Sequence, residues 1–79
     1  MKQVLTDIAK AIVNSPESVV VTEREEGENV FLELKVAADD MGKVIGKHGR
    51  IANAIRAVVK ATANRDNKRV IVNIISDEE

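Results

Sequence analysis

Residues 41–51, MGKVIGKHGRI, decide the fold and contain the candidate site. The stretch holds three of the chain's four glycines, with cationic side chains before, between and after Gly46 and Gly49. Glycine adopts positive φ without steric cost, so these two positions predict a tight bend. A helical pattern of aliphatic residues starts at Ile51. The N–H groups that open a helix lack intrahelical partners and carry positive dipole charge, so this bend offers donors to a phosphate.

Two better-known phosphate-binding loops do not fit this stretch. A Walker loop has two glycines five positions apart, followed by Lys and then Ser or Thr. Gly42 and Gly46 are one residue too close, and His48 occupies the place of the hydroxyl. A dinucleotide-binding Gly-x-Gly-x-x-Gly ending at Gly46 and Gly49 would need a glycine at Val44. Neither kind of nucleotide loop is therefore predicted.

Length and composition predict one small domain over residues 1–79. Hydrophobic residues form 44% of the chain and aromatic ones 1%, so the core must be built of Val, Ile, Leu and Ala. Such a core is thin, and oligomerisation is an ordinary way to add buried area. The absence of Cys excludes a disulfide framework and a thiolate metal site. A polar N-terminus and the lack of a long apolar run predict a cytoplasmic protein without a membrane span.

The charge is unevenly distributed along the chain. The formal net charge is −1, which by itself argues against a polyanionic partner. Residues 42–69, however, carry eight Lys or Arg side chains against one acidic side chain, Asp66. A charge run is usually just a solvated helix face, but acidic residues are nearly absent around this loop. We therefore interpret this half as the electrostatic footprint of a polyanion-binding surface.

The first half of the chain predicts a helix followed by a β-hairpin. Aliphatic spacing predicts a helix over residues 2–13 that ends before Pro16. Residues 18–24 are β-rich, residues 25–29 form a polar link, and residues 30–36 alternate as a half-buried strand. The apolar face of the helix is predicted from these residues: Val4, Leu5, Ile8, Ala11 and Ile12. Phe31 is predicted on the outer, more polar face of the sheet, as an edge or partner contact.

The second half predicts two helices around the bend and a last strand. Asp39 is a good N-cap for a short helix reaching about residue 44, and Gly42 within it suggests close packing. A long helix is predicted over residues 50–63 and a strand over residues 69–75, with a frayed tail from about residue 76. The order α-β-β-α-α-β predicts an α+β fold, a three-stranded sheet with helices on one face.

The stretch around the glycine pair resembles the signature loop of the KH family. It has the apolar pair Val44-Ile45 before the glycines, a basic residue between them and an amphipathic helix after them. The element order is similar to the type II, bacterial-type KH fold, and the likeness covers nearly the whole chain. The resemblance implies an RNA-binding protein, a post-transcriptional regulator or RNA chaperone, that binds single-stranded RNA, with single-stranded DNA as the alternative ligand. It resembles small stand-alone bacterial KH proteins, which self-associate and also pair with a larger KH-containing protein.

The resemblance also assigns roles to residues. In KH domains the Gly-x-x-Gly loop clamps the backbone of a four-nucleotide single strand beside an apolar groove. Carried over to this sequence, the clamp consists of Gly46, Lys47, His48 and Gly49. The flanking phosphate contacts are Lys43, Arg50 and Arg56. The floor of the groove is formed by Val44, Ile45 and Ile51. Ile45 and Ile55 are predicted as core from helical spacing. No aromatic residue lies near the loop, so base stacking should be weak and sequence preference shallow.

An enzyme is the least favoured class. His48 is the only histidine, and Asp39 and Asp40 are better explained as caps than as an acid–base pair. No cofactor and no metal site is predicted. The rival interpretation is a protein–protein interaction adaptor that uses the same loop and helix face without nucleic acid.

One apolar stripe of the long helix predicts self-association. Ile51, Ala54, Val58 and Ala61 recur at helical spacing beside the stripe through Ile55, Val59 and Thr62. One sheet cannot easily cover both stripes, so one is expected to face a second copy or a related KH partner. The alternative is that both stripes belong to the core of a monomer.

Overall fold

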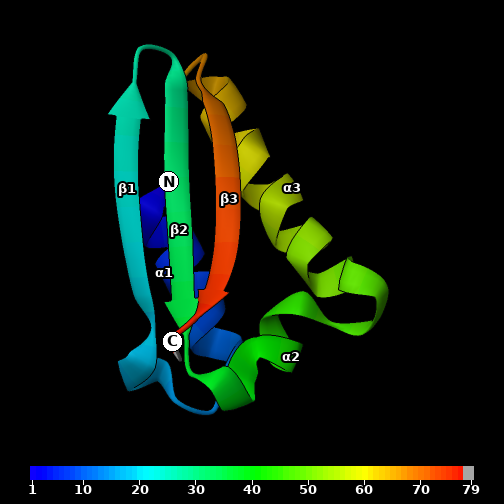
Figure 1. Cartoon of the computed structure of the whole chain (residues 1–79). Coiled ribbons are helices and arrows are strands. Elements are labelled where there is room, and N and C mark those ends of the chain that lie inside the picture. Colours follow the sequence, from blue (N-terminus) through cyan, green and yellow to red (C-terminus); the bar gives the residue numbers. More distant parts are fainter. Residues whose placement is uncertain (78–79) are drawn as a thin grey trace.

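Three strands form one mixed sheet in the order β1-β2-β3 (Figure 1). The strands are β1 (Val20–Glu26), β2 (Asn29–Val36) and β3 (Arg69–Ser76). β1 runs antiparallel to β2, whereas β2 and β3 are parallel. A parallel pair needs a long crossover, and here helices α2 (Met41–Ile45) and α3 (Arg50–Arg65) supply it. The computed structural model describes residues 1–77.

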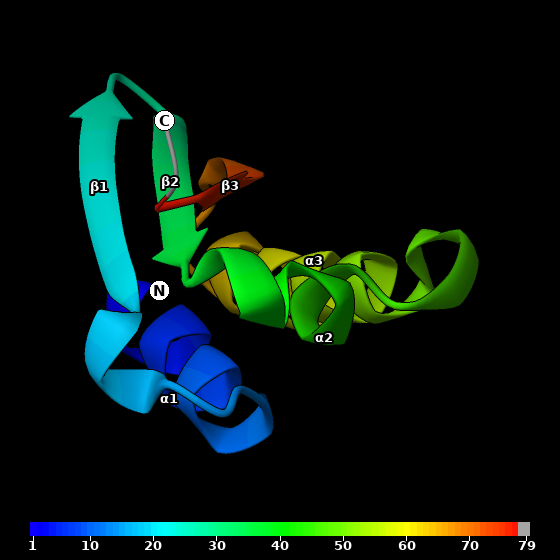
Figure 2. The ribbon, with the colours of Figure 1, turned by 60° about the horizontal axis from the view of Figure 1, so that its bottom comes forward.

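The core lies between one face of the sheet and the helices, as the sequence predicted. Alternation along β2 sends four aliphatic side chains inward, and none is more than 1% exposed: Val30, Leu32, Leu34 and Val36. Helix α1 (Lys2–Ile12) adds Leu5 and Ala9, and α3 adds a stripe made of Ala52, Ile55, Val59 and Ala63. Figure 2 shows α1 and α3 on the same side of the sheet. The α+β arrangement with helices on one face is therefore confirmed.

The hairpin is tighter than the sequence indicated. The predicted polar link over residues 25–29 was wrong, because Glu25, Glu26 and Asn29 all belong to the strand ladder. Only Gly27 and Glu28 remain in the turn, and Gly27 has a φ of 60°. Two-residue turns that begin with a positive φ match the twist of antiparallel strands, so Gly27 fixes the position of the turn. The strand therefore extends through Glu25 and Glu26, although glutamate is a weak strand former.

The free edge of the sheet, β1, is strongly charged. Its residues 23–26 read Glu-Arg-Glu-Glu, and all four are exposed. Arg24 pairs with Glu26 at 3.1 Å, and its guanidinium carbon lies 4.8 Å from the centre of the Phe31 ring on β2. Phe31 is thus on the outer face, as predicted, where it is covered by an arginine of its own chain. Lys68 bonds to Glu25 on this edge, and that hydrogen bond raises the pKa of Lys68.

A buried carboxylate joins the two halves of the chain. Asp39, the predicted N-cap, is exposed and makes no capping bond, so that prediction was wrong. Its neighbour Asp40 is only 1% exposed and accepts bonds from the backbone N–H groups of Asn14 at 3.1 Å and Ser15 at 3.0 Å. A buried charge is tolerated only when it is hydrogen-bonded. Asp40 therefore ties the segment after α1 to the start of α2.

One further prediction fails in the second half of the chain. Gly42 does not pack closely, because a Cβ added there would meet nothing within 4 Å. At the start of the predicted tail, Ser76 ends β3 and the Asp77 N–H donates to the Val36 carbonyl at 2.8 Å. Fraying from about residue 76 stays a prediction. The remaining tail residues, 78 and 79, lie outside the described part of the chain.

Replacing Asp40 with Ala should lower the free energy of unfolding by about 2–4 kcal/mol, because two buried N–H groups lose a charged acceptor. Urea unfolding followed by circular dichroism measures this change. Asp39→Ala is the matched control, and as an exposed substitution it should cost no more than about 0.5 kcal/mol. Equal losses in the two variants would contradict the role given to Asp40.

Candidate nucleic-acid interface

The loop between α2 and α3 is built from left-handed backbone. Gly46 has φ 74° and ψ 176° and stops α2, while its N–H donates to the Gly42 carbonyl at 2.9 Å. One 3-10 turn, η3 (Lys47–Gly49), follows, in which His48 has φ 59° and Gly49 has φ 74°. The Gly49 N–H donates back to the Gly46 carbonyl at 3.2 Å. Figure 2 shows this loop at the end of the helix pair, projecting away from the sheet.

The two glycines of the loop have different reasons to be glycine. A Cβ on Gly46 would lie 2.6 Å from Cγ1 and 2.9 Å from Cδ1 of Ile51, well inside contact distance. A Cβ on Gly49 would meet nothing within 4 Å. Gly46 is therefore needed for its positive φ and for close approach of the next helix. Gly49 is needed only for its backbone conformation.

His48 is a strained position on the loop. Left-handed backbone costs a residue with a Cβ about 1–2 kcal/mol, although His, Asn and Asp adopt it more often than others. Strain of this kind is common where backbone meets a ligand. The side chains of both Lys47 and His48 are exposed. The turn therefore holds the two side chains between the glycines in solvent, where an anion can reach them.

The three flanking cations lie in different environments. Lys43 on α2 and Arg50 at the start of α3 are exposed next to the loop. Arg56 is partly buried, and its Nε donates to the Val72 carbonyl of β3 at 3.2 Å. The structure thus places Lys43 and Arg50 with the loop, and it places Arg56 further along α3, at the seam between α3 and β3.

The predicted groove floor needs correction. Val44 is fully buried in the core at the end of α2, so it offers no surface to a ligand. Ile45 was named for the groove floor and also predicted as core from helical spacing; it is 36% exposed, so the core prediction was wrong. Ile51 is 40% exposed and lies against Gly46. Helix α2 has only five residues, and so short a segment gives no periodicity from which its inward face can be read. Ile55, by contrast, is core as predicted, at 3% exposed.

An apolar hollow of about 390 Å³ lies between α1 and α3. We call its lining the α1–α3 apolar face; it consists of Ile8, Ile12, Arg50, Ile51, Ala54, Ile55 and Val58. The stripe predicted outside the core is indeed unburied, with Val58 48% exposed and both Ala54 and Ala61 exposed. The sequence missed the contribution of α1 to this face, because all of its aliphatic stripe was assigned to the core. Leu5 is buried as predicted and Ile8 packs partly against the core, but Ile12 is 37% exposed, and Ala9, which was not predicted, is buried.

Other kinds of site receive no support within residues 1–77. No set of three or more His, Cys, Asp or Glu side chains in this range is placed to hold a metal ion. None of the helices in the same range combines the length and apolar character needed to cross a bilayer.

Replacing Gly46 with Ala should destabilise the protein by about 2–4 kcal/mol, because backbone strain at φ 74° and ψ 176°, a region essentially restricted to glycine, adds to overpacking against Ile51. Gly49→Ala is the matched control and should cost about 1–2 kcal/mol from strain alone. Chemical unfolding of the two variants measures the difference. A Gly49 variant as unstable as the Gly46 variant would show that the contact with Ile51 is unimportant.

Comparison with known proteins identifies the family. Residues 2–74 match the family model described as KhpA/KhpB, KH domain. The protein named RNA-binding protein KhpA from Clostridium acetobutylicum is 59% identical over 75 residues, which cover 95% of this chain and 100% of that protein. Proteins of the same name from Clostridium perfringens and Caldanaerobacter subterraneus are 57% and 55% identical over the same shares. A family of this kind consists of binding modules, and the chain is not an enzyme.

A solved structure shows the same fold in a longer protein. It is the crystal structure of Era in complex with MgGDPNP and nucleotides 1506–1542 of 16S ribosomal RNA. The match has a TM-score of 0.66 at 15% identity and covers 95% of this chain but 29% of the Era chain. At this identity the likeness speaks for the fold alone. By its sequence, its element order and its glycine loop, the chain belongs to the KhpA/KhpB KH domain family.

Proposed function

We propose that this protein is a single KH domain that binds single-stranded RNA through residues 46–49. The observation that carries the proposal is the loop geometry, in which left-handed backbone projects Lys47 and His48 into solvent between two glycines. Similar proteins of this length are named RNA-binding proteins, which favours RNA over single-stranded DNA. In the cell we expect a cytoplasmic post-transcriptional regulator or RNA chaperone.

The proposed contact is a backbone clamp. The Lys47 ammonium and the His48 ring offer charged or polar N–H donors to phosphate oxygens, and the N–H groups that open the η3 turn add to them. Lys43 and Arg50 extend the cationic surface on either side of the loop. Ile45 and Ile51 are exposed next to it and provide apolar contact for bases. A KH clamp of this kind spans about four nucleotides.

The same geometry predicts modest affinity and a shallow sequence preference. Stacking on an aromatic side chain is worth about 1–3 kcal/mol per base. Phe31, the chain's single aromatic residue, lies on the outer face of the sheet beneath Arg24 and is unavailable to the loop. Most of the binding free energy should therefore come from phosphate contacts, which carry little sequence information.

Replacing Lys47 and His48 with Asp should weaken RNA binding about 100-fold or more, since each lost charged hydrogen bond is worth about 1.5–3 kcal/mol. Both side chains are exposed and Asp tolerates left-handed backbone, so the fold should be unchanged. Fluorescence anisotropy with labelled RNA measures binding, and circular dichroism of the same sample checks folding. The control Lys2→Asp with Lys10→Asp makes a closely similar change of charge on α1. Unchanged binding in the folded loop variant would reject the assigned site.

Self-association through the α1–α3 apolar face is part of the proposal. Three large aliphatic side chains on this face are 37–48% exposed: Ile12, Ile51 and Val58. Small residues at Ala54 and Ala61 allow two copies of α3 to approach closely in a symmetric pair. Arg50 lines the same face at the loop end, so a homodimer of this kind brings two loops to one assembly and raises avidity for a longer strand. A heteromer with a KhpB-like KH protein would use the same surface.

Val58→Glu should convert the homodimer to a monomer, because it introduces a charge into the centre of the proposed interface. Val58 is 48% exposed, so the monomer fold should survive the change. Asn53→Glu is the matched control, since Asn53 is exposed on α3 but does not line the hollow and is not a helical neighbour of Ala54 or Ala61. Analytical ultracentrifugation at tens of micromolar decides the result. A monomeric wild-type protein, or a Val58→Glu protein that remains dimeric, would overturn the dimer proposal.

The α1–α3 apolar face also supports a second candidate function, a protein–protein interaction adaptor that binds no nucleic acid. An apolar hollow lined almost entirely by aliphatic side chains is typical of a protein-binding surface. Binding of RNA by the wild-type protein separates the two functions. An RNA-binding domain changes the anisotropy of labelled RNA, whereas an adaptor that docks through the loop and the helix face leaves it unchanged.

A further inference from the structure

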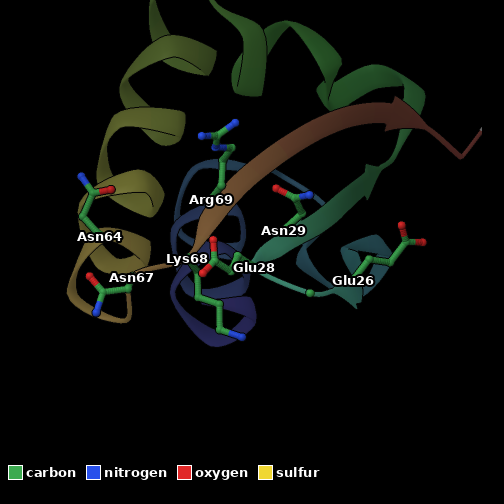
Figure 3. Close-up of a pocket in the computed structure, with 8 residues that line it drawn as sticks. Glu26, Glu28, Asn29, Asn64, Asn67, Lys68 and Arg69 are labelled. Atoms are coloured by element: carbon green, nitrogen blue, oxygen red, sulfur yellow. The ribbon is translucent and has the colours of Figure 1, made fainter.

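A second, polar hollow lies at the opposite end of α3 from the glycine loop (Figure 3). It has a volume of about 660 Å³, and the β1–β2 turn and the connection from α3 to β3 form its walls. Its lining is entirely polar apart from one glycine: Glu26, Gly27, Glu28, Asn29, Asn64, Asn67, Lys68 and Arg69. None of these residues belongs to the glycine loop or to the α1–α3 apolar face. We call it the distal hollow.

The walls of the distal hollow are held in place by defined bonds. The Arg69 N–H donates to the Glu28 carbonyl at 2.8 Å and joins the two connections. The Lys68 N–H donates to the Ala63 carbonyl at 3.0 Å, and the Lys68 side chain bonds to Glu25. Asn67 has a φ of 56° and turns the chain from α3 into β3. The hollow is therefore a preorganised surface and not a gap between loose turns.

Ion pairs within the chain leave the carboxylate of Glu28 and the guanidinium of Arg69 available at the distal hollow. Glu25 is paired with Lys68, and Glu26 is paired with Arg24. Within residues 1–77, Glu28 forms no ion pair at contact distance, although its charge helps to raise the pKa of Lys68, and neither Arg69 nor the nearby Lys60 forms an ion pair. The hollow thus places a carboxylate and amide side chains beside a cation. A bare phosphate would use only the cations. A nucleotide fits both kinds of group, because its phosphate is an anion for the cations and its base has hydrogen-bonding edges for the carboxylate and the amides.

The distal hollow continues along α3 toward the loop. A smaller hollow of about 160 Å³ shares Asn64, Lys68 and Arg69 with it and extends it to Lys60. Arg56 lies one helical turn before Lys60 and is held at the same α3–β3 seam by its bond to the Val72 carbonyl. Polar and cationic side chains therefore follow the seam from the distal hollow toward the loop. Helix α3 has 16 residues, which corresponds to about 24 Å.

We propose that the distal hollow is a second subsite for the same RNA strand, which takes a nucleotide beyond the four held at the loop. The backbone phosphate lies on Lys60 and Arg69. The base lies against Glu28 and Asn64, so the subsite favours bases with an exocyclic amino group, which a carboxylate accepts as it does from cytosine N4. The inference rests on the proposed RNA binding, and it makes binding dependent on strand length.

The test compares RNA of about four nucleotides, the span of a KH clamp, with RNA about three times longer. Lys60→Glu with Arg69→Glu should weaken binding of the longer RNA at least tenfold and leave the short RNA unaffected. Loss of two phosphate contacts should also make the slope of log K against log salt for the longer RNA less steep by about 1.4. Lys2→Glu with Lys10→Glu is the charge-matched control. Circular dichroism checks that each variant is folded.

The outcomes of this test separate the inference from the proposed function. If the loop variant abolishes binding of both RNAs while the distal variant weakens only the longer one, both statements stand. If the distal variant binds the longer RNA as the wild type does, or if the α1 control loses as much affinity, the distal subsite is rejected while RNA binding at the loop remains. If the wild-type protein binds neither RNA, both statements fail.

A second arm tests the base preference of the subsite. A longer RNA extended with cytidines should bind more tightly than one extended with uridines, because uracil presents a carbonyl where cytosine presents an amino group. Glu28→Gln should reduce that difference without changing the affinity for the short RNA, since an amide serves as donor and acceptor alike. Equal affinity for the two extensions in the wild-type protein would remove the base contact from the proposal.

Discussion

The parallel pairing of β2 with β3 is the constraint on which the rest of the structure depends. Two parallel neighbours cannot be joined by a turn, so the chain must leave the end of β2 and return to its beginning. The pair of helices α2 and α3 makes that return, and the glycine loop is the point where the path reverses. The bonds of Arg69 with Glu28 and of Asp77 with Val36 fasten the strand at its two ends. The loop therefore projects because the crossover has to turn outside the sheet.

The strands and the loop could be predicted from the sequence because each carries a strong local signal. Alternation over residues 30–36 fixed the inward face of β2, and the spacing of Gly46 and Gly49 before an amphipathic pattern fixed the bend. In both cases the geometry depends on residues that are neighbours in the chain. The sequence did not reveal the second reason for a glycine at position 46. Its close approach to Ile51 is seen only when α3 is placed against the loop.

The errors arose where the deciding contact is distant or the element is short. Asp39 and Asp40 are equivalent caps from sequence alone; what distinguishes them is a pair of backbone amides after α1, far away in the chain. The five residues of α2 are too few to show a period, so buried Val44 was expected in the groove floor, and Ile45, which is 36% exposed, was favoured as core. The distal hollow was not foreseen, because its lining comes from two separate connections and includes no recognisable motif.

The parallel register also has a consequence for the order of folding. The β1–β2 hairpin closes through a two-residue turn and pairs residues that are close in sequence. β3 pairs Asn29 with Arg69 and can do so only after the whole intervening segment has found its place, at a larger cost in loop-closure entropy. The hairpin is thus the part of the sheet that can form early, and the parallel pair forms last. A partly folded chain would contain the hairpin, with the α2–α3 crossover not yet fixed against the sheet by β3.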